Sequence, residues 1–158
     1  MITEFMDTDF LRDGEIFLKC TEQNPGDPAK NWVPAYHFAI CAPDGTEMGK
    51  CDLRLGHSQR LYYGGHIGYR VEEPYRGHHF AGKAVKLLLE LAKRHELGHL
   101  YITCDPSNAA SYKTCVWAGG RFIETVELPE DNDMRVEDGK THVCVFRWDI
   151  ENGRTEKR

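Results

Sequence analysis

The sequence predicts one α/β domain in which strands form a mixed sheet and one helix crosses between two of them. Segments of alternating apolar and polar residues lie on both sides of the middle of the chain, as in antiparallel strands. A strong helical repeat at 81–95 separates two further strand-like segments, which predicts a strand-helix-strand crossover. The 158 residues, 41% of them hydrophobic, are enough to bury one core.

The first half of the chain reads as strands. Residues 15–22 alternate, and a stretch dense in turn residues follows them. Residues 32–55 predict a hairpin, because Pro43-Asp44-Gly45 supplies a fixed φ and a permissive glycine at its turn. Residues 64–73 predict a further strand with a bulge or a close backbone approach at Gly68, and Pro74 ends it.

The second half begins with the most regular element. Apolar residues recur at helical spacing from Ala81 to Ala92, basic residues occupy the last turn, and Gly98 closes the helix. The remaining pattern predicts a strand at 99–104, a short helix that ends at Gly119-Gly120, and strands at 121–128 and 142–150. An acidic loop joins the last two strands.

The domain is expected to cover residues 1–150, and residues 151–158 are expected to form a polar tail that frays. The N-terminal residues are acidic where a signal peptide is basic, and no apolar run reaches the roughly 18 residues that a membrane span needs. We therefore expect a cytoplasmic protein with no membrane partner.

Charge and cysteine spacing exclude two further classes. A net charge of −5 without a cluster of Lys and Arg argues against a nucleic-acid partner. The 6 cysteines form no C-x-x-C pair, so buried free thiols are expected, and with the 8 histidines scattered we expect no metal site. Small or positively charged molecules fit better as partners.

The segment Gly77–Lys83 has the G-x-x-x-x-G-K spacing of a triphosphate-binding loop. The next residue is Ala84, which lacks the hydroxyl that would coordinate magnesium. The loop still leads into a helix, whose first N–H groups attract an anion. It therefore predicts a pyrophosphate site without a metal, and a triphosphate-dependent kinase or NTPase stays as an alternative.

The same residues, read as Arg76-Gly77-His78-His79-Phe80-Ala81, resemble the R/Q-x-x-G-x-G/A signature of the GNAT superfamily of N-acetyltransferases. Asn108, Ser111 and Gly119 resemble the N-x-x-S helix and glycine turn that follow it there. The resemblance covers about residues 64–128 and is nearest to the ribosomal-protein-alanine-acetyltransferase-like branch. His79 replaces the central glycine of the signature, and Ala118-Gly119-Gly120 replaces the usual L-G-F.

The resemblance implies a GNAT-like mixed, mostly antiparallel sheet that splays at its centre, between the strands at 65–71 and 99–104. It also implies acetyl-CoA as cosubstrate and no metal. Backbone N–H groups of residues 78–83 would hold the pyrophosphate, and main-chain groups of residues 69–71 would pair with pantetheine. The implied cofactor-binding residues are Tyr69, Val71, Arg76, Gly77, His78, His79, Phe80, Ala81, Gly82, Lys83 and Asn108.

By resemblance, the reaction would be direct attack of a primary amine on the thioester in a ternary complex, with the Val71 N–H polarising the carbonyl. Because a free alkyl amine has a pKa of about 10.4, a carboxylate or a water chain must take its proton. Glu72 and Glu73 are the candidates, and strand alternation lets only one of them face the site. Tyr112 or Cys115 would protonate the leaving thiolate, unless no acid is needed.

The acceptor stays open at this point, because a small molecule and a peptide both carry suitable amines. The acidic loop at 130–138 would attract a cationic amine, unless it is only a solvated loop. A homodimer through an exposed edge strand is also expected. The alternative to an enzyme is a non-catalytic acyl-CoA-binding module on the same fold.

Overall fold

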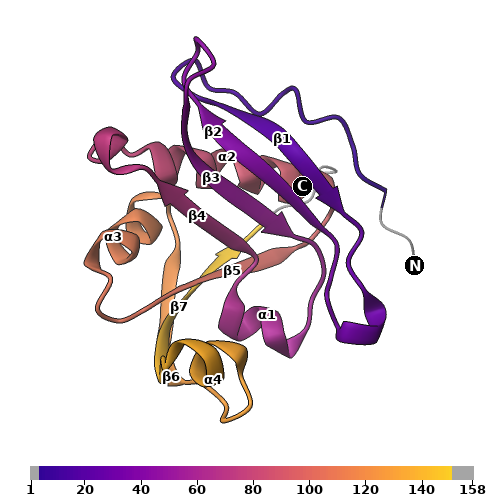
Figure 1. The fold of residues 1–158 in the computed structure, drawn as a ribbon, viewed down its shortest axis with the longest axis vertical. Coiled ribbons are helices and arrows are strands. Elements are labelled where there is room, and N and C mark those ends of the chain that lie inside the picture. The colour runs from indigo at the N-terminus through magenta and orange to yellow at the C-terminus, as the bar shows by residue number, and fades with distance from the viewer. Residues whose placement is uncertain (1–3, 151–158) are drawn as a thin grey trace, which may run out of the picture.

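The computed structural model describes residues 4–150, so the tail predicted at 151–158 lies outside the described residues. Strands β1 (Phe17–Asn24), β2 (Ala35–Cys41), β3 (Glu47–Arg54) and β4 (Ile67–Val71) form one antiparallel sheet in that order (Figure 1). The hairpin predicted at Pro43-Asp44-Gly45 is the β2–β3 connection.

A second antiparallel sheet has the order β5-β7-β6, from β5 (His99–Cys104), β7 (His142–Asp149) and β6 (Arg121–Glu127). Strands β4 and β5 are the edges at which the two sheets meet, and they share no ladder. The predicted splay is therefore confirmed as a separation of the sheet into two parts between β4 and β5.

Helix α2 (Phe80–Arg94) is the predicted crossover between β4 and β5, and it lies behind the four-stranded sheet in Figure 1. Helix α3 (Ala109–Trp117) follows β5, as predicted. The other helical pieces are short: η1 (Pro28–Lys30), α1 (Gln59–Gly64), η2 (Glu73–Tyr75) and α4 (Asp133–Asp138).

The short helices α1 and α4 correct the sequence prediction. Residues 133–138 were expected to be loop, but the Asn132 side chain accepts from Met134 N–H and Gly139 closes the turn at φ 71°. The strand predicted from residue 64 begins at Ile67, because the α1 segment is helical and Gly65 has φ 81°. One or two turns carry too few apolar residues to show a helical period.

One hydrophobic core joins both sheets to α2. The α2 face that includes Val85, Leu88 and Leu91 is fully buried, and it packs in one cluster with Phe38 of the first sheet and Phe146 of the second. Burying side chains of this size stabilises the fold by roughly 1.5–3 kcal/mol each. The core therefore fixes where α2 begins relative to the end of β4.

The two sheets are tied together at one end by His66, which is 1% exposed. Its backbone N–H donates to Tyr101 O at 2.7 Å, and its Nδ1 accepts from Tyr101 N–H at 3.0 Å. With Nδ1 as acceptor, Nε2 carries the proton and donates to Gly56 O at 2.9 Å. The splay between β4 and β5 thus opens away from His66.

The two outer edge strands each carry a β-bulge. In β1 the register shifts between Cys20 and Glu22, and in β6 it shifts between Phe122 and Glu124. Each bulge inserts one unpaired residue, Thr21 or Ile123, into its strand.

All six cysteines are free thiols, and five of them are buried, as the sequence predicts. Within residues 4–150, no three His, Cys, Asp or Glu side chains gather in a way that could hold a metal ion. None of the helices described in this range is long and apolar enough to cross a membrane.

Candidate acyl-CoA site

The free edge of β4 presents unpaired backbone groups. Glu72 N–H donates to Met48 O on β3 at 2.8 Å, and the pairing of Val71 with Gly49 follows the same register. Because successive residues of a strand point their N–H groups to opposite sides, the N–H groups of Val71 and Tyr69 point away from β3. Both therefore face the gap toward β5.

The chain leaves β4 through η2 and reaches α2 with a bare helix start. Arg76 turns back along this path, and its Nε donates to Val71 O at 2.8 Å. His79 is the N-cap residue of α2, but its side chain caps no backbone group. The first helical bond is Lys83 N–H to His79 O at 2.8 Å, so the N–H groups of residues 80–82 have no acceptor within the helix.

His79 adopts the left-handed conformation that a glycine would favour, with φ 63° and ψ 22°. Its imidazole stacks on Trp117 of α3, with ring centres 4.4 Å apart and planes within 7°. The imidazole therefore points toward α3 rather than along the helix axis. The side chain that replaces the signature glycine contributes to the contact between the two helices.

Two substitutions of His79 separate the free-energy cost of its left-handed backbone from the stabilisation that its ring gains by stacking on Trp117. His79→Gly removes a strained left-handed residue, which offsets the lost ring contact, and we expect a change in unfolding free energy within about 0.5 kcal/mol. His79→Ala keeps the strain and loses the stacking, so it should destabilise by about 1–2 kcal/mol. Urea unfolding of the two variants checks this, and equal stabilities would show that the left-handed backbone costs nothing here.

Gly82 allows α2 to approach α3 closely. A Cβ at this position would lie 2.4 Å from the Trp117 ring, a distance too short for a non-bonded contact. Lys86 places its ammonium 4.3 Å from the centre of the same ring. Trp117 is thus held by His79, Gly82 and Lys86, and it joins the start of α2 to the end of α3.

The lysine of the G-x-x-x-x-G-K spacing is turned away from the loop. The Lys83 ammonium forms an ion pair with Glu15, and its own N–H is the first helical donor. Neither group of Lys83 is free for a phosphate. This arrangement, together with Ala84, weakens the triphosphate alternative.

Asn108 and Ser111 lie at the start of α3, as their motif requires. The Asn108 side chain accepts from Ser111 N–H at 3.0 Å and caps the helix. Ser111 Oγ lies 2.7 Å from the hydroxyl of Tyr69, which reaches across from β4. The structure thus brings Tyr69, Ser111 and Asn108 together between β4 and α3.

Cys115 lies one turn further along α3, and its Sγ is 3.7 Å from the Tyr69 hydroxyl. Burial, outweighing this contact with Tyr69, raises the pKa of the fully buried Cys115 thiol to about 12. Burial also raises the pKa of Tyr69 strongly. Both groups therefore stay protonated and uncharged at neutral pH.

The side chains of the other predicted catalytic residues have different surroundings. Tyr112 is 38% exposed and packs edge-on against Phe146 of β7, with ring centres 4.9 Å apart. Glu72 and Glu73 are both exposed, at the end of β4 and the start of η2. The sequence left Tyr112, Cys115 or no residue as the acid, and the structure places the Cys115 thiol against the Tyr69 hydroxyl of β4.

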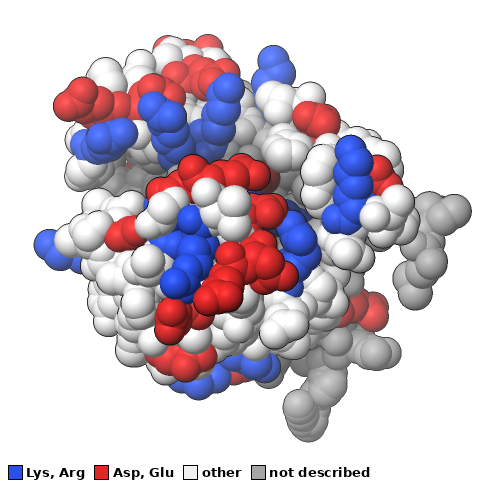
Figure 2. Space-filling model, turned by 60° about the horizontal axis from the view of Figure 1, so that its bottom comes forward, with Lys and Arg blue, Asp and Glu red and all other residues white. Residues whose placement is uncertain are grey.

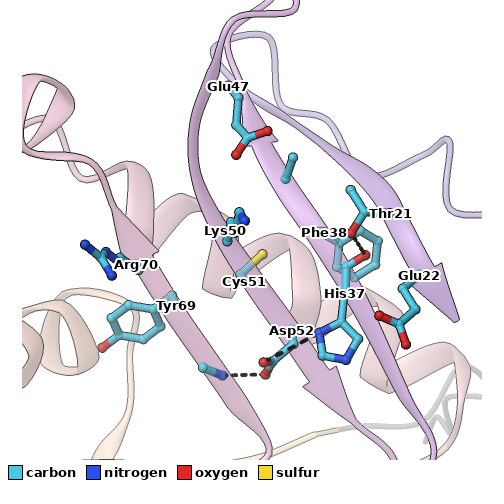
Figure 3. A pocket seen from close by; sticks show the side chains of 12 residues that line it. Thr21, Glu22, His37, Phe38, Glu47, Lys50, Cys51, Asp52, Tyr69 and Arg70 are labelled. Carbon is cyan, nitrogen blue, oxygen red and sulfur yellow. Dashed lines mark hydrogen bonds and ion pairs between the residues drawn. The ribbon is translucent and has the colours of Figure 1, made fainter. Parts of the chain in front are cut away.

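A hollow of about 510 Å³ on the outer face of the first sheet was missed by the sequence analysis (Figure 3). Its lining includes Tyr69 and Arg70 of β4 together with His37 and Asp52 from β2 and β3. These side chains come from separate strands, so no local motif signals them. The register of the predicted hairpin, which sets His37 opposite Asp52, is the signal that would have found them.

A second hollow of about 650 Å³ adjoins the first, because His37 and Asp52 line both. It is bounded by Trp32 in the β1–β2 connection, by α1, and by the segment that leads into α4. The face that carries α1 and α4 shows acidic and basic side chains interspersed, with no large area of one sign (Figure 2). Arg60 of α1 and Asp133 of α4 form an ion pair there at 3.0 Å.

Several solved structures with a similar fold are acetyltransferases by name. A ribosomal-protein-S5-alanine acetyltransferase from Vibrio fischeri shares 17% identity over 77% of this chain and 64% of its own, with a TM-score of 0.58. RimL, a ribosomal L7/L12 alpha-N-protein acetyltransferase in complex with coenzyme A, shares 16% over 74% and 63%, with a TM-score of 0.57. The acetyltransferase MccE, in complex with acetyl-CoA and AMP, shares 17% over 73% and 61%, with a TM-score of 0.58.

These chains are longer, and the present chain spans less than two thirds of each of them. No curated protein sequence matches the chain significantly. The family model described as "Acetyltransferase (GNAT) domain" matches residues 15–121, which is more than half of the chain. The chain therefore belongs to the GNAT acetyltransferase family.

Proposed function

We propose that the protein is an N-acetyltransferase that transfers the acetyl group of acetyl-CoA to a primary amine. The observation that carries the proposal is that an amide-binding strand edge and an anion-binding helix start follow each other along the chain. The unpaired edge of β4 leads within a few residues to the uncapped start of α2. A ligand that joins a pyrophosphate to an amide-containing arm fits both features at once.

In this proposal the N–H groups of residues 80–82, with those of Gly77, His78 and His79, bind the pyrophosphate. The pantetheine arm then runs along β4 from Val71 toward His66, where the sheets close. Val71 N–H is the donor nearest the loop, and Tyr69 N–H lies one pair further along the same edge. One of these two N–H groups polarises the thioester carbonyl, and the other donates a hydrogen bond to the pantetheine arm.

Proton transfer completes the chemistry. The amine, whose pKa when free is about 10.4, gives up a proton to a base before it attacks, and Glu72 and Glu73 are the candidate carboxylates that lie next to Val71 in the sequence. The amine nitrogen forms the C–N bond, the C–S bond breaks, and the leaving thiolate takes the second proton that the nitrogen loses. The protonated pair Tyr69 and Cys115 lies beside the β4 edge and supplies hydrogen bonds to that thiolate.

The names of the structural neighbours suggest only a broad class of acceptor. Because several structural neighbours are ribosomal-protein acetyltransferases by name, we propose a peptide or small-molecule amine. We further propose that residues 1–150 form one domain, that the protein acts in the cytoplasm, and that it forms homodimers.

Thermal unfolding with acetyl-CoA, with CoA, and with ATP or GTP plus magnesium tests the proposal. A ligand at 100 times its Kd adds about 2.7 kcal/mol to the stability of the folded state and raises the Tm. We expect a rise with acetyl-CoA and CoA and none with the nucleotides. A rise that depends on magnesium and nucleotide would favour the triphosphate alternative, and binding without turnover on any amine would favour the non-catalytic module.

Charge at Gly77 tests the pyrophosphate loop directly. Gly77 has φ 92°, and a Cβ there would meet nothing within 4 Å, so Glu and Gln cause equal strain and fit equally well. We expect Gly77→Glu to bind CoA about tenfold more weakly than Gly77→Gln, a difference of about 1.4 kcal/mol, because only Glu repels the pyrophosphate. Calorimetry measures both, and equal affinities would place the pyrophosphate elsewhere.

A further inference from the structure

Four residues on the outer face of the first sheet stand in one row across its strands. Glu22 of β1 lies opposite His37 of β2, His37 lies opposite Asp52 of β3, and Asp52 lies opposite Gly68 of β4. With strands about 4.8 Å apart, the row is about 14 Å long. It starts at the outer edge of the sheet and ends at the strand whose edge faces the proposed thioester site.

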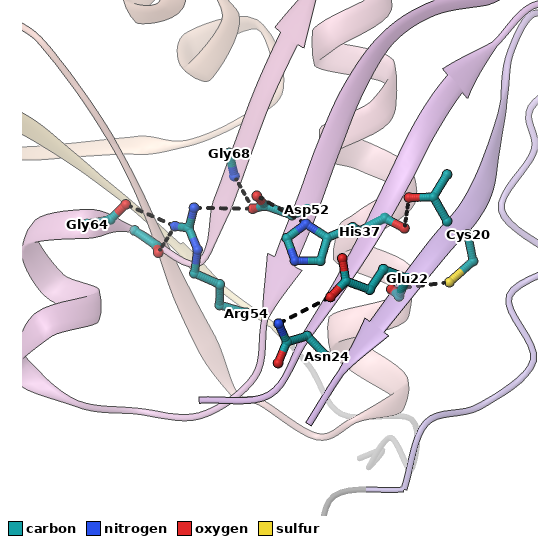
Figure 4. Close-up of polar contacts among 10 residues, drawn as sticks. Cys20, Glu22, Asn24, His37, Asp52, Arg54, Gly64 and Gly68 are labelled. Atoms are coloured by element: carbon teal, nitrogen blue, oxygen red, sulfur yellow. Dashed lines mark hydrogen bonds and ion pairs between the residues drawn. The ribbon is translucent and has the colours of Figure 1, made fainter. Parts of the chain in front are cut away.

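Asp52 is the fixed member of this row (Figure 4). Its Oδ1 accepts from Gly68 N–H at 3.0 Å and lies 3.4 Å from Arg54 Nη2. Its Oδ2 lies 4.0 Å from His37 Nδ1, close enough for a bridging water or a small rotation to complete a hydrogen bond. Arg54 is held in turn by Gly65 O at 2.7 Å.

Gly68 leaves the β4 end of the row uncovered. With no side chain there, Asp52 faces β4 directly, and a Cβ would come within 3.3 Å of both the Asp52 and the Arg54 side chains. His37 and Asp52 also line both hollows, so they stand where the two hollows meet. A molecule lying in either hollow can present an amine to this pair.

We propose, resting on the acetyltransferase function proposed above, that the acceptor amine binds on the outer face beside Gly68 and transfers its proton to the Asp52–His37 pair. The ammonium gives one proton to this pair, which takes the place of Glu72 and Glu73 as the base, and the neutral nitrogen attacks the thioester carbonyl from the outer face. The C–N bond forms as the C–S bond breaks, and the second proton that the nitrogen loses goes to the departing thiolate. His37 then passes the proton toward Glu22 and the solvent.

Charged groups on the neighbouring strands surround His37. Two carboxylates, Glu22 and Asp52, flank the imidazole on the neighbouring strands, and Arg54 lies beyond Asp52. The next row across the sheet is Lys19, Ala39, Lys50 and Arg70. The two carboxylates attract an ammonium ion to this face, whereas Arg54 and the three cations of the next row repel it.

The second row supplies an experiment that needs no known acceptor. Arg70→Lys places an amine on β4 beside Gly68 and keeps the charge, while Lys50 and Lys19 stand further away in the same row. The variant is incubated with acetyl-CoA, and acetylation at each lysine is measured by mass spectrometry. We expect residue 70 to be acetylated at least tenfold faster than the exposed Lys113 on α3, with Lys50 intermediate.

The proton relay is tested in the Arg70→Lys background. His37→Gln and Asp52→Asn should each slow acetylation at residue 70 about 10- to 100-fold at pH 7, and less at pH 9.5, where more of the lysine is already neutral. Glu47→Gln is the control, because it removes a carboxylate that lines the same hollow outside the row and should leave the rate unchanged. A merely structural role would not produce this pH-dependent rescue.

The outcomes separate the two proposals. If acetyl-CoA raises the Tm but residue 70 is acetylated no faster than Lys113, the outer-face acceptor site is overturned while acetyl-CoA binding stands. If residue 70 is acetylated and the His37 and Asp52 variants react at the parent rate at both pH values, the relay is overturned. If acetyl-CoA neither raises the Tm nor labels residue 70, the acetyltransferase function itself fails.

Discussion

Gly49→Ala is expected to destabilise the protein by about 3–5 kcal/mol, a large part of the stability of a domain of this size. Gly49 lies in β3 opposite Val71, and a Cβ there would sit 2.2 Å from Arg70 O and 2.9 Å from Val71 Cα. Backbone atoms cannot rotate away as a side chain can, so β3 and β4 must separate. The edge that presents Val71 N–H would move with β4.

Urea unfolding gives the stability change, and calorimetry with CoA gives the accompanying loss of affinity. Gly64→Ala is the matched control, because Gly64 ends a helix, has no neighbour within 4 Å of a Cβ and lacks a positive φ. It should be neutral or slightly stabilising. A Gly49 variant as stable as the Gly64 variant would mean that β3 and β4 are less closely paired than described.

The stability should also fall by about 3 kcal/mol as the pH drops from about 6.5 to about 4, through His66 alone. Burial lowers the pKa of His66 from 6.5 to about 4, outweighing its hydrogen bond to Gly56 O. The unfolded chain therefore binds one more proton than the folded chain in this window, and acid favours unfolding. Above about pH 6.5 the contribution is fully present and no longer changes.

Urea titrations between pH 4 and pH 8 measure the slope, and His66→Asn is the comparison. The variant should be less stable throughout, because it loses bonds to Tyr101 or Gly56, yet its stability should depend less on pH. Some slope will remain, because burial also lowers the pKa values of His95 and His99. An unchanged slope would mean that His66 is protonated in the folded protein.

The sequence predicted the fold well where an element is long or strongly patterned. The repeat from Ala81 to Ala92 lies within α2, and the short apolar run at 99–104 is β5 itself. The errors fall on α1 and α4, each 6 residues long. Local turn contacts form these helices, and they bury too few residues to produce a helical pattern of apolar side chains. Contacts within one or two turns stabilise a helix only weakly, and they leave no repeating apolar pattern by which a sequence reveals a core helix.

The candidate site likewise has a part that local sequence predicts and a part that it does not. The helix entry at 76–83 was predictable because consecutive residues form it and Gly77 has a positive φ of 92°. The reason for Gly82 is its contact with Trp117 of α3, which no local spacing shows. The contact between Tyr69 and Ser111 joins a strand to a helix 42 residues later, and the Glu22, His37 and Asp52 row joins three strands. Only the packing of α2 and the register of the sheet bring these groups together, so spacing along the chain could not identify them.

The bulges in β1 and β6 bear on how the molecule behaves at high concentration. Every sheet edge offers a template to which another chain can add a strand, and this is how many proteins aggregate. Here the inner edges β4 and β5 face each other, while the outer edges are interrupted at Thr21 and Ile123. A second copy that extended either sheet would first have to flatten a bulge, so these sheets resist open-ended growth into fibres, and a homodimer would form more readily through side-chain surfaces.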